Sequence, residues 1–196
     1  MARARNLRLI LASASPRRVE ILRHAGFQIV ARPAHVDESV RVGESPAKHV
    51  ARLAREKAAA VAKRILTPAV VIGADTVVVV GREILGKPSS PRDARRMLRL
   101  LSGKTHKVLT GVAVLCLMPG TRSVRLFSAV ESTNVRFAPL SAREIYAYVA
   151  TGEPMGKAGA YAIQGRAGKF VTRIEGCYFN VVGLPLARLY RMLISL

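Results

Sequence analysis

The most constraining feature of this sequence is the segment 70–80, VVIGADTVVVV, which is apolar at nearly every position. Such a run, rich in β-branched residues, predicts a central strand covered on both faces of a sheet. It contains Asp75, and burying an ionised carboxylate is unfavourable unless the group is paired, binds a metal or opens onto a cleft. Because Gly73 leaves the backbone uncovered and Thr76 adds a hydroxyl, we expect Asp75 at a strand end facing a cleft. The alternative is an arginine partner in the core.

Apolar residues along the rest of the chain alternate between strand-like and helix-like spacing, which is typical of an α/β domain. Three helices are predicted to begin at a serine N-cap followed by proline, at Ser15-Pro16, Ser45-Pro46 and Ser90-Pro91. They should end at Gly26, about Ile65 and Gly103, and further helices should span 141–150 and 185–196. Strands are expected at 7–12, 27–32, 70–80, 106–117, 124–137 and 170–182, with an antiparallel hairpin through Pro119-Gly120. Residues 81–86 should form a turn, and residues 152–168 a glycine-rich loop at a site.

The length of 196 residues, half of them apolar, suits one substantial core. We therefore expect a single domain, 1–196, built on a twisted mixed sheet flanked by helices, with two lobes around a cleft. No apolar run approaches the roughly 18 to 20 residues of a membrane span, so a membrane protein is not expected. Cys116 and Cys177 lack the spacing of a zinc site or disulfide framework, which suits the cytoplasm. A homodimer is one of the assemblies that the sequence allows.

The formal net charge of +20 predicts attraction to polyanions at low salt. The basic residues are spread along the chain, however, and aromatic residues that stack on bases make up only 5% of it. We therefore expect nucleic-acid binding to be at most non-specific.

Lys57 lies in the middle of the face that the second helix is expected to bury. The apolar members of that face are Val50, Leu53, Ala54, Ala58, Val61 and Ile65. A lysine at mid-helix must either extend outward to water or meet an anion, and we interpret Lys57 as a site residue.

The segment SASPRR, 13–18, spans a predicted strand-to-helix junction. The free N–H groups of a helix N-terminus favour anions, whereas Arg17 and Arg18 in the first turn oppose the helix dipole. A bound phosphate would reverse that penalty, so we expect a phosphate site here; the alternative is two exposed arginines.

The segment GREILGKP, 81–88, matches a P-loop only up to its lysine. Pro88 replaces the Ser or Thr that would hold magnesium, so a Walker-type NTPase is not expected. Without an HExxH motif or a histidine cluster, hydrolytic chemistry would depend on carboxylates, lysines and a metal.

Seven segments form a familiar pattern along nearly the whole chain. They are LASASPRR (11–18), LAREKA (53–58), GADTVV (73–78), LGKP (85–88), LSGKTHKVLTG (101–111), AGAYAIQG (158–165) and VVGLP (181–185). In this order they resemble the Maf family of nucleoside triphosphate pyrophosphatases. The residues that indicate a branch of this family are Arg17, Thr76 and Gln164. This combination resembles the branch that acts on dTTP and UTP, rather than the branch that acts on 7-methyl-GTP.

The resemblance implies that Asp75 accepts a proton, and our mechanistic hypothesis is that Asp75, helped by Glu38, holds a divalent cation, Mg or Mn. Lys57 and Lys87 would complete the catalytic group. The substrate-binding residues would be Ser13, Ser15, Arg17, Arg18, Thr76 and Gln164. One departure from the family pattern is Gly156, where an aspartate is usual, and its loss could reduce activity or metal affinity.

These observations predict an enzyme that hydrolyses dTTP and UTP, or modified pyrimidine nucleotides, to the monophosphate and pyrophosphate. Two rival classes stay open. A nucleic-acid-binding protein would explain the charge, and a catalytically silent nucleotide sensor would explain the motifs together with Gly156.

Overall fold

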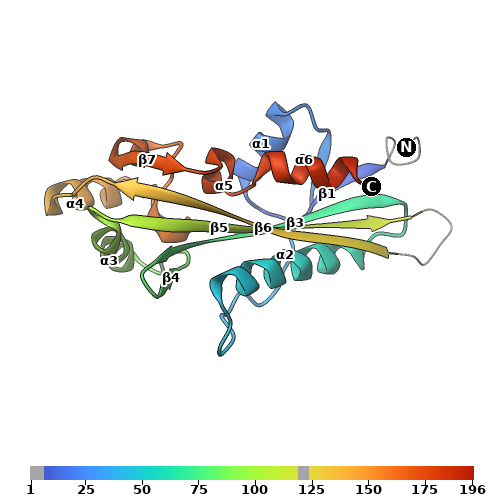
Figure 1. Ribbon diagram of the computed structural model, residues 1–196, viewed down its shortest axis with the longest axis horizontal. Helices are drawn as coiled ribbons and strands as arrows, with labels where there is room; N and C mark the ends of the chain where they lie inside the picture. The colour runs from blue at the N-terminus through green and yellow to red at the C-terminus, as the bar shows by residue number, and fades with distance from the viewer. Residues whose placement is uncertain (1–6, 119–123) are drawn as a thin grey trace. The chain divides into compact units, whose positions relative to one another are not determined.

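The computed structural model describes residues 7–118 and 124–196. Its elements, most of them labelled in Figure 1, are β1 (Arg8–Leu11), α1 (Pro16–His24), β2 (Ile29–Ala31), α2 (Pro46–Ala62), β3 (Ala69–Val80), β4 (Glu83–Leu85), α3 (Pro91–Leu101), β5 (Thr105–Leu117), β6 (Val124–Phe137), α4 (Ala142–Ala150), the 3-10 helices η1 (Ala158–Ala160) and η2 (Arg166–Phe170), β7 (Val171–Glu175), α5 (Tyr178–Val182) and α6 (Leu186–Ile194). In the described ranges no helix is long and apolar enough to cross a membrane.

The strands form one mixed sheet in the order β2-β1-β3-β5-β6-β7, and β4 pairs with β3. β2 and β3 run parallel to β1, whereas β4 is antiparallel to β3 and β7 is antiparallel to β6. β5 and β6 are neighbours, as the predicted hairpin requires, while Pro119-Gly120 lies outside the described residues. The α/β class and the mixed sheet are confirmed.

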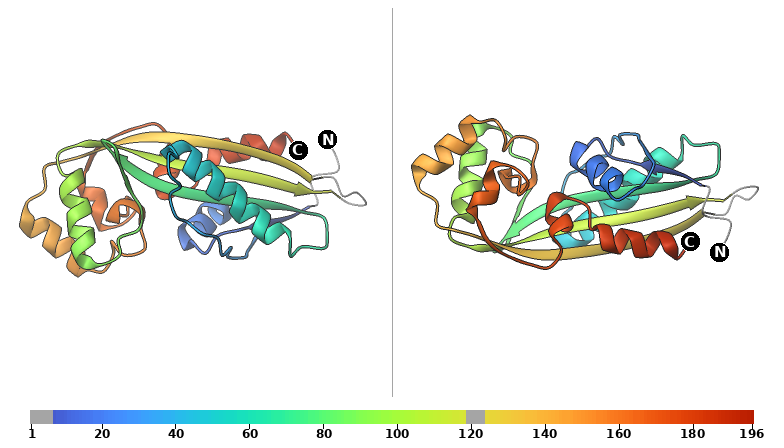
Figure 2. Two further views of the ribbon diagram at one scale, coloured as in Figure 1. Left: turned by 90° about the horizontal axis from the view of Figure 1, so that it is seen from below. Right: turned by 90° about the horizontal axis from the view of Figure 1, so that it is seen from above.

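The chain folds into two compact units. It passes from one unit to the other within the strands β3, β5 and β6. Unit 1 contains Met1–Asp75, Thr110–Glu131 and Gly183–Leu196. Within it, α2 and α6 lie on opposite faces of the sheet (Figures 1 and 2). One of its apolar clusters is built mainly from small and β-branched side chains: Ile10, Ala12, Ala54, Ala58, Val61, Ala62, Ala69, Val71, Ala113 and Leu115.

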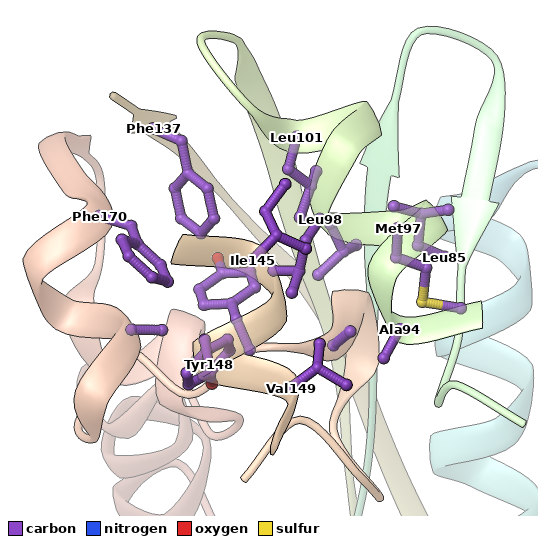
Figure 3. Close-up of a cluster of buried hydrophobic side chains, with 14 of the residues drawn as sticks. Leu85, Ala94, Met97, Leu98, Leu101, Phe137, Ile145, Tyr148, Val149 and Phe170 are labelled. Atoms are coloured by element: carbon purple, nitrogen blue, oxygen red, sulfur yellow. The ribbon is translucent and has the colours of Figure 1, made fainter. Parts of the chain in front are cut away.

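Unit 2 contains Thr76–Leu109 and Ser132–Val182. Its core is richer in large side chains, and Figure 3 shows the leucines of α3 beside the aromatic rings of β6, α4 and η2. Phe170 meets Tyr148 edge-on with ring centroids 5.4 Å apart. The predicted cleft between two lobes and the single-domain assignment stay predictions.

The three Ser-Pro helices begin where the sequence places them, and Ser45 and Ser90 cap α2 and α3 through their side chains. Ser15 occupies the N-cap position of α1 without a side-chain cap bond. Ser141 and Glu144 form a capping box at the start of α4.

Two expectations about secondary structure are wrong. Residues 81–86 contain the strand β4, because Gly81 with φ of 58° lets the chain reverse and pair Val80 with Glu83. The strand expected over 170–182 ends at Glu175, and α5 follows. Gly176, with φ of 123°, passes close to the Thr133 backbone, so the extended conformation stops there.

α2 packs unusually close to the sheet of unit 1, because two glycines face it. A Cβ on Gly73 of β3 would lie 2.0 Å from the Ala54 carbonyl oxygen, and a Cβ on Gly111 of β5 would lie 2.2 Å from the Val50 carbonyl oxygen. Alternate residues of a strand share a face, so Asp75 points to the same side as Gly73. The glycine contact therefore determines how near α2 can come to Asp75.

Gly73→Ala should force α2 away from β3 and lower the free energy of unfolding by about 3 kcal/mol, the upper part of the usual overpacking range. Thermal or chemical unfolding followed by circular dichroism measures the loss. Gly86→Ala is the matched control, because a Cβ there meets nothing within 4 Å. Equal stability of both variants would contradict the close approach.

Candidate active site

Lys57 is buried on α2, with 7% of the residue exposed, and joins two carboxylates of unit 1. Its Nζ lies 2.6 Å from Asp75 Oδ1 and 2.6 Å from Glu38 Oε1. The lysine therefore meets anions instead of extending outward to water. This arrangement brings together three of the four predicted catalytic residues.

The environment of Asp75 differs from the sequence-based expectation. The residue is 7% exposed, and β3 continues beyond it to Val80, so the predicted strand end is wrong. Its buried charge is compensated by the ion pair with Lys57, and the charge of buried Arg18 also acts on it. The sequence did not reveal this pairing because the two residues belong to different elements, which only the packing of α2 on β3 brings together.

Arg18 forms a second buried cationic position, and its side chain donates to two backbone carbonyls and to the Ser13 hydroxyl. Nε donates to the Gly183 carbonyl at 2.8 Å, while Nη1 donates to the Ala74 carbonyl at 2.8 Å and to Ser13 Oγ at 3.1 Å. Burial lowers the pKa of Arg18, and the charge of Asp75 opposes that shift. Arg18 thus ties the β1–α1 junction to β3 next to Asp75, so the alternative of an exposed arginine is wrong here.

The other residues of the SASPRR segment lie around the start of α1. Ser13 is buried and accepts a hydrogen bond from the Ser15 backbone N–H at 3.2 Å. Ser15 and Arg17 are partly exposed, and Arg17 lies in the first helical turn. The segment therefore presents Arg17 at the end of the helix that favours anions.

Unit 2 carries the remaining predicted site residues. Thr76 follows Asp75 in β3 and is partly exposed, and Lys87 is exposed after β4. The Gly86 carbonyl accepts a hydrogen bond from the Gly159 N–H at 3.0 Å, which joins the segment of Lys87 to η1. Gln164 is exposed between η1 and η2.

Glu153 stabilises the loop that carries Gln164 through hydrogen bonds. This residue was not identified by the sequence analysis. Its carboxylate accepts from the Tyr148 hydroxyl at 2.9 Å and from the Arg166 N–H at 3.1 Å. A Cβ on Gly165 would lie 2.6 Å from that carboxylate, so the Glu153 side chain would have to shift to accommodate a larger residue there. The available signal was an acidic residue within the predicted glycine-rich loop, 152–168.

A model of the family described as Maf-like protein matches residues 8–196. The chain belongs to the Maf family. A dTTP/UTP pyrophosphatase of Anaeromyxobacter sp. (strain Fw109-5) is 55% identical over 186 residues, which cover 95% of this chain and 88% of that protein. A dTTP/UTP pyrophosphatase of Koribacter versatilis (strain Ellin345) is 54% identical over 185 residues, which cover 94% of this chain and 92% of that protein.

Among solved structures, the Staphylococcus aureus Ham1 protein matches 96% of this chain and 98% of its own length, with 13% identity and a TM-score of 0.44. The assignment to the Maf family depends on the sequence matches alone.

The carboxylates of this Maf-family chain suit a hard divalent cation. Asp75 and Glu38 bind the same ammonium group, and carboxylate oxygens are the ligands that Mg²⁺ prefers, commonly one or two of them together with substrate phosphates. Across the part of the chain that the structure describes, no group of three or more His, Cys, Asp and Glu residues could hold a metal. The two acids fit a cation that shares its coordination with water and substrate.

Gly156, the departure from the Maf pattern, has φ of 72°, and a Cβ there would meet nothing within 4 Å. Glycine adopts this left-handed conformation without strain. The substitution therefore suits the local backbone of this chain.

The segment bearing Glu38 is held to α2 by a group of charges that sequence reasoning also missed. Arg52 Nε and Nη2 donate to the two carboxylate oxygens of Glu44 at 2.7 and 2.8 Å. Hydrogen bonding from Arg52 is the main cause that lowers the pKa of Glu44 from 4.5 to about 2. An arginine next to the apolar face of the second helix was the signal for a buried ion pair.

Because its pKa is lower in the folded protein, Glu44 stabilises the fold above pH 4.5, and this contribution is lost as the pH falls toward about 2. Glu44→Gln should lower the free energy of unfolding at neutral pH, and its deficit relative to the wild type should shrink through that range. Denaturant titrations at several pH values measure the deficit, with exposed Glu20→Gln as control. A deficit independent of pH would argue against the ion pair.

Proposed function

We propose that this protein is a nucleotide pyrophosphatase that hydrolyses dTTP and UTP to the monophosphate and pyrophosphate. The observation that carries the proposal is the convergence of Asp75 and Glu38 on Lys57, with Asp75 and Lys57 lying in two of the segments that resemble the Maf family. Relatives more than 50% identical over most of the chain are named dTTP/UTP pyrophosphatases. Modified pyrimidine nucleotides are further candidate substrates, and the 7-methyl-GTP branch is the alternative.

Asp75 is proposed to accept the proton of the water that attacks the α-phosphorus. Lys57 fixes the position of this carboxylate through the contact at Oδ1, and the close packing of α2 keeps that contact in place. Asp75 and Glu38 would hold Mg or Mn, which supplies positive charge to the phosphate oxygens.

Positive charge from Arg17, Lys57 and Lys87 would offset the charge that grows on the leaving pyrophosphate. Ser13 and Ser15 lie at the start of α1, where backbone N–H groups favour phosphate. Arg18 adds its charge from a buried position while Nε and Nη1 hold the backbone. Thr76 and Gln164 would contact the base edge.

A cytoplasmic location is part of the proposal, supported by two cysteines that are both free thiols. A homodimer is kept as a candidate assembly. Non-specific nucleic-acid binding remains compatible with the charge of +20, and it would be salt-sensitive and survive Asp75→Asn.

Asp75→Asn should reduce pyrophosphate release by about 100- to 10,000-fold, because the amide cannot accept the proton of the attacking water. The assay incubates the protein with dTTP, UTP, CTP, GTP and 7-methyl-GTP and with Mg or Mn, and measures pyrophosphate. Glu20→Gln, an exposed carboxylate on α1, should retain full activity. Triphosphate binding without turnover by the wild type would support the silent sensor instead.

Gln164→Ala should relax the choice of base more than it slows the reaction, because an amide can pair with the carbonyl and N–H of a pyrimidine together. Comparing kcat/KM for dTTP, UTP, CTP and GTP between wild type and variant measures this. An unchanged ranking of the four nucleotides counts against the role of Gln164.

A further inference from the structure

The segment 37–43 carries Glu38 and has little apolar packing of its own. Every residue in it is exposed, and Val40 and Val42 are 51% and 107% exposed. Hydrophobic burial therefore contributes little to its position. Polar contacts to α2 must hold the Glu38 carboxylate beside Lys57.

Arg52 supplies the most extensive of the described contacts. This side chain of α2 is buried, and besides its forked pair with Glu44 it donates from Nη2 to the Ser39 carbonyl at 2.9 Å. Forked arginine–carboxylate pairs are among the stronger hydrogen-bonded ion pairs and fix direction as well as distance. Arg52 thus holds the segment both next to Glu38 and at its junction with α2.

The positions of Arg52 and Lys57 on the same helix, α2, explain why the contacts of Arg52 affect Glu38. Lys57 binds Glu38 and Arg52 binds the carbonyl of the next residue, Ser39, so one helix holds two consecutive residues of the segment. The contact between Arg41 and Glu56 is more exposed, with side chains 64% and 35% accessible, and such pairs contribute little.

We propose that Arg52 is a positioning residue for Glu38. By binding Glu44 and the Ser39 carbonyl, it determines the position of the Glu38 carboxylate without contacting the substrate. The inference rests on the proposed function, since Glu38 is assigned there to the reaction. His49 and Glu56 also contact this group, through Glu44 Oε2 at 3.1 Å and Arg52 Nη1 at 3.0 Å. Both residues belong to α2 and add contacts to the pair of Arg52 and Glu44.

A double-mutant cycle of Arg52 with Glu38 tests this role. Arg52→Gln should lower kcat by about 10- to 100-fold, the range that displacement of a catalytic group by about 1 Å produces. In a Glu38→Gln background, the same change should have almost no further effect on kcat, because its action passes through Glu38. Arg55→Gln, an exposed arginine on the same helix, is the matched control and should leave kcat unchanged.

Amide hydrogen exchange of the free protein provides a readout that needs no turnover. In Arg52→Gln, exchange should accelerate in 38–44 while β3 keeps its protection, and Arg55→Gln should match the wild type. If Arg52→Gln does not fold, Glu44→Gln removes the other half of the fork and takes its place in both experiments.

Losses in kcat that multiply in the double variant, or unchanged exchange in 38–44, would overturn the positioning role. Absence of pyrophosphate release from the wild type is a different result, because it refutes the proposed function. In that case amide hydrogen exchange still decides whether Arg52 holds the segment 37–43 against α2. The catalytic role proposed for that contact is refuted together with the function.

Discussion

The close approach of α2 to β3 is the constraint on which the candidate site depends. Gly73 has no side chain to separate the strand from Ala54 and Ala58, and Asp75 points to the same face two residues later. Lys57, next to Ala58, consequently reaches Asp75 at 2.6 Å. A buried carboxylate in a covered strand is tolerable here because the helix delivers its counter-charge.

Unit 1 pairs its buried cations with oxygen acceptors, although the chain is strongly basic. Lys57 meets two carboxylates, Arg52 meets Glu44, and Arg18 meets backbone carbonyls and a hydroxyl. Each is at most 8% exposed, so each would be costly to bury without its acceptors. Lys57 and Arg52 lie on α2 and Arg18 lies on α1, so the pairing of these buried charges depends on both helices.

Much of the local structure follows from the sequence because its signals act over a few residues. Ser-Pro pairs begin α1, α2 and α3, and the apolar spacing identified the face of α2 that contains Lys57. The three-residue strand β4 and the helix α5 escaped this reasoning. Both follow glycines whose positive φ redirects the chain, and their partners lie on other strands.

The sequence by itself determined the α/β class and the family, and it supplied the candidate site residues, since periodicity and short motifs are properties of neighbouring positions. Only the tertiary structure decided that Asp75 is a mid-strand residue paired with Lys57, that Arg18 holds the backbone, and that Arg52 grips the segment of Glu38. The physical reason is that an ion pair needs atoms within a few ångströms. Which charges come that close depends on how α2 packs against the sheet, and linear spacing does not encode that distance.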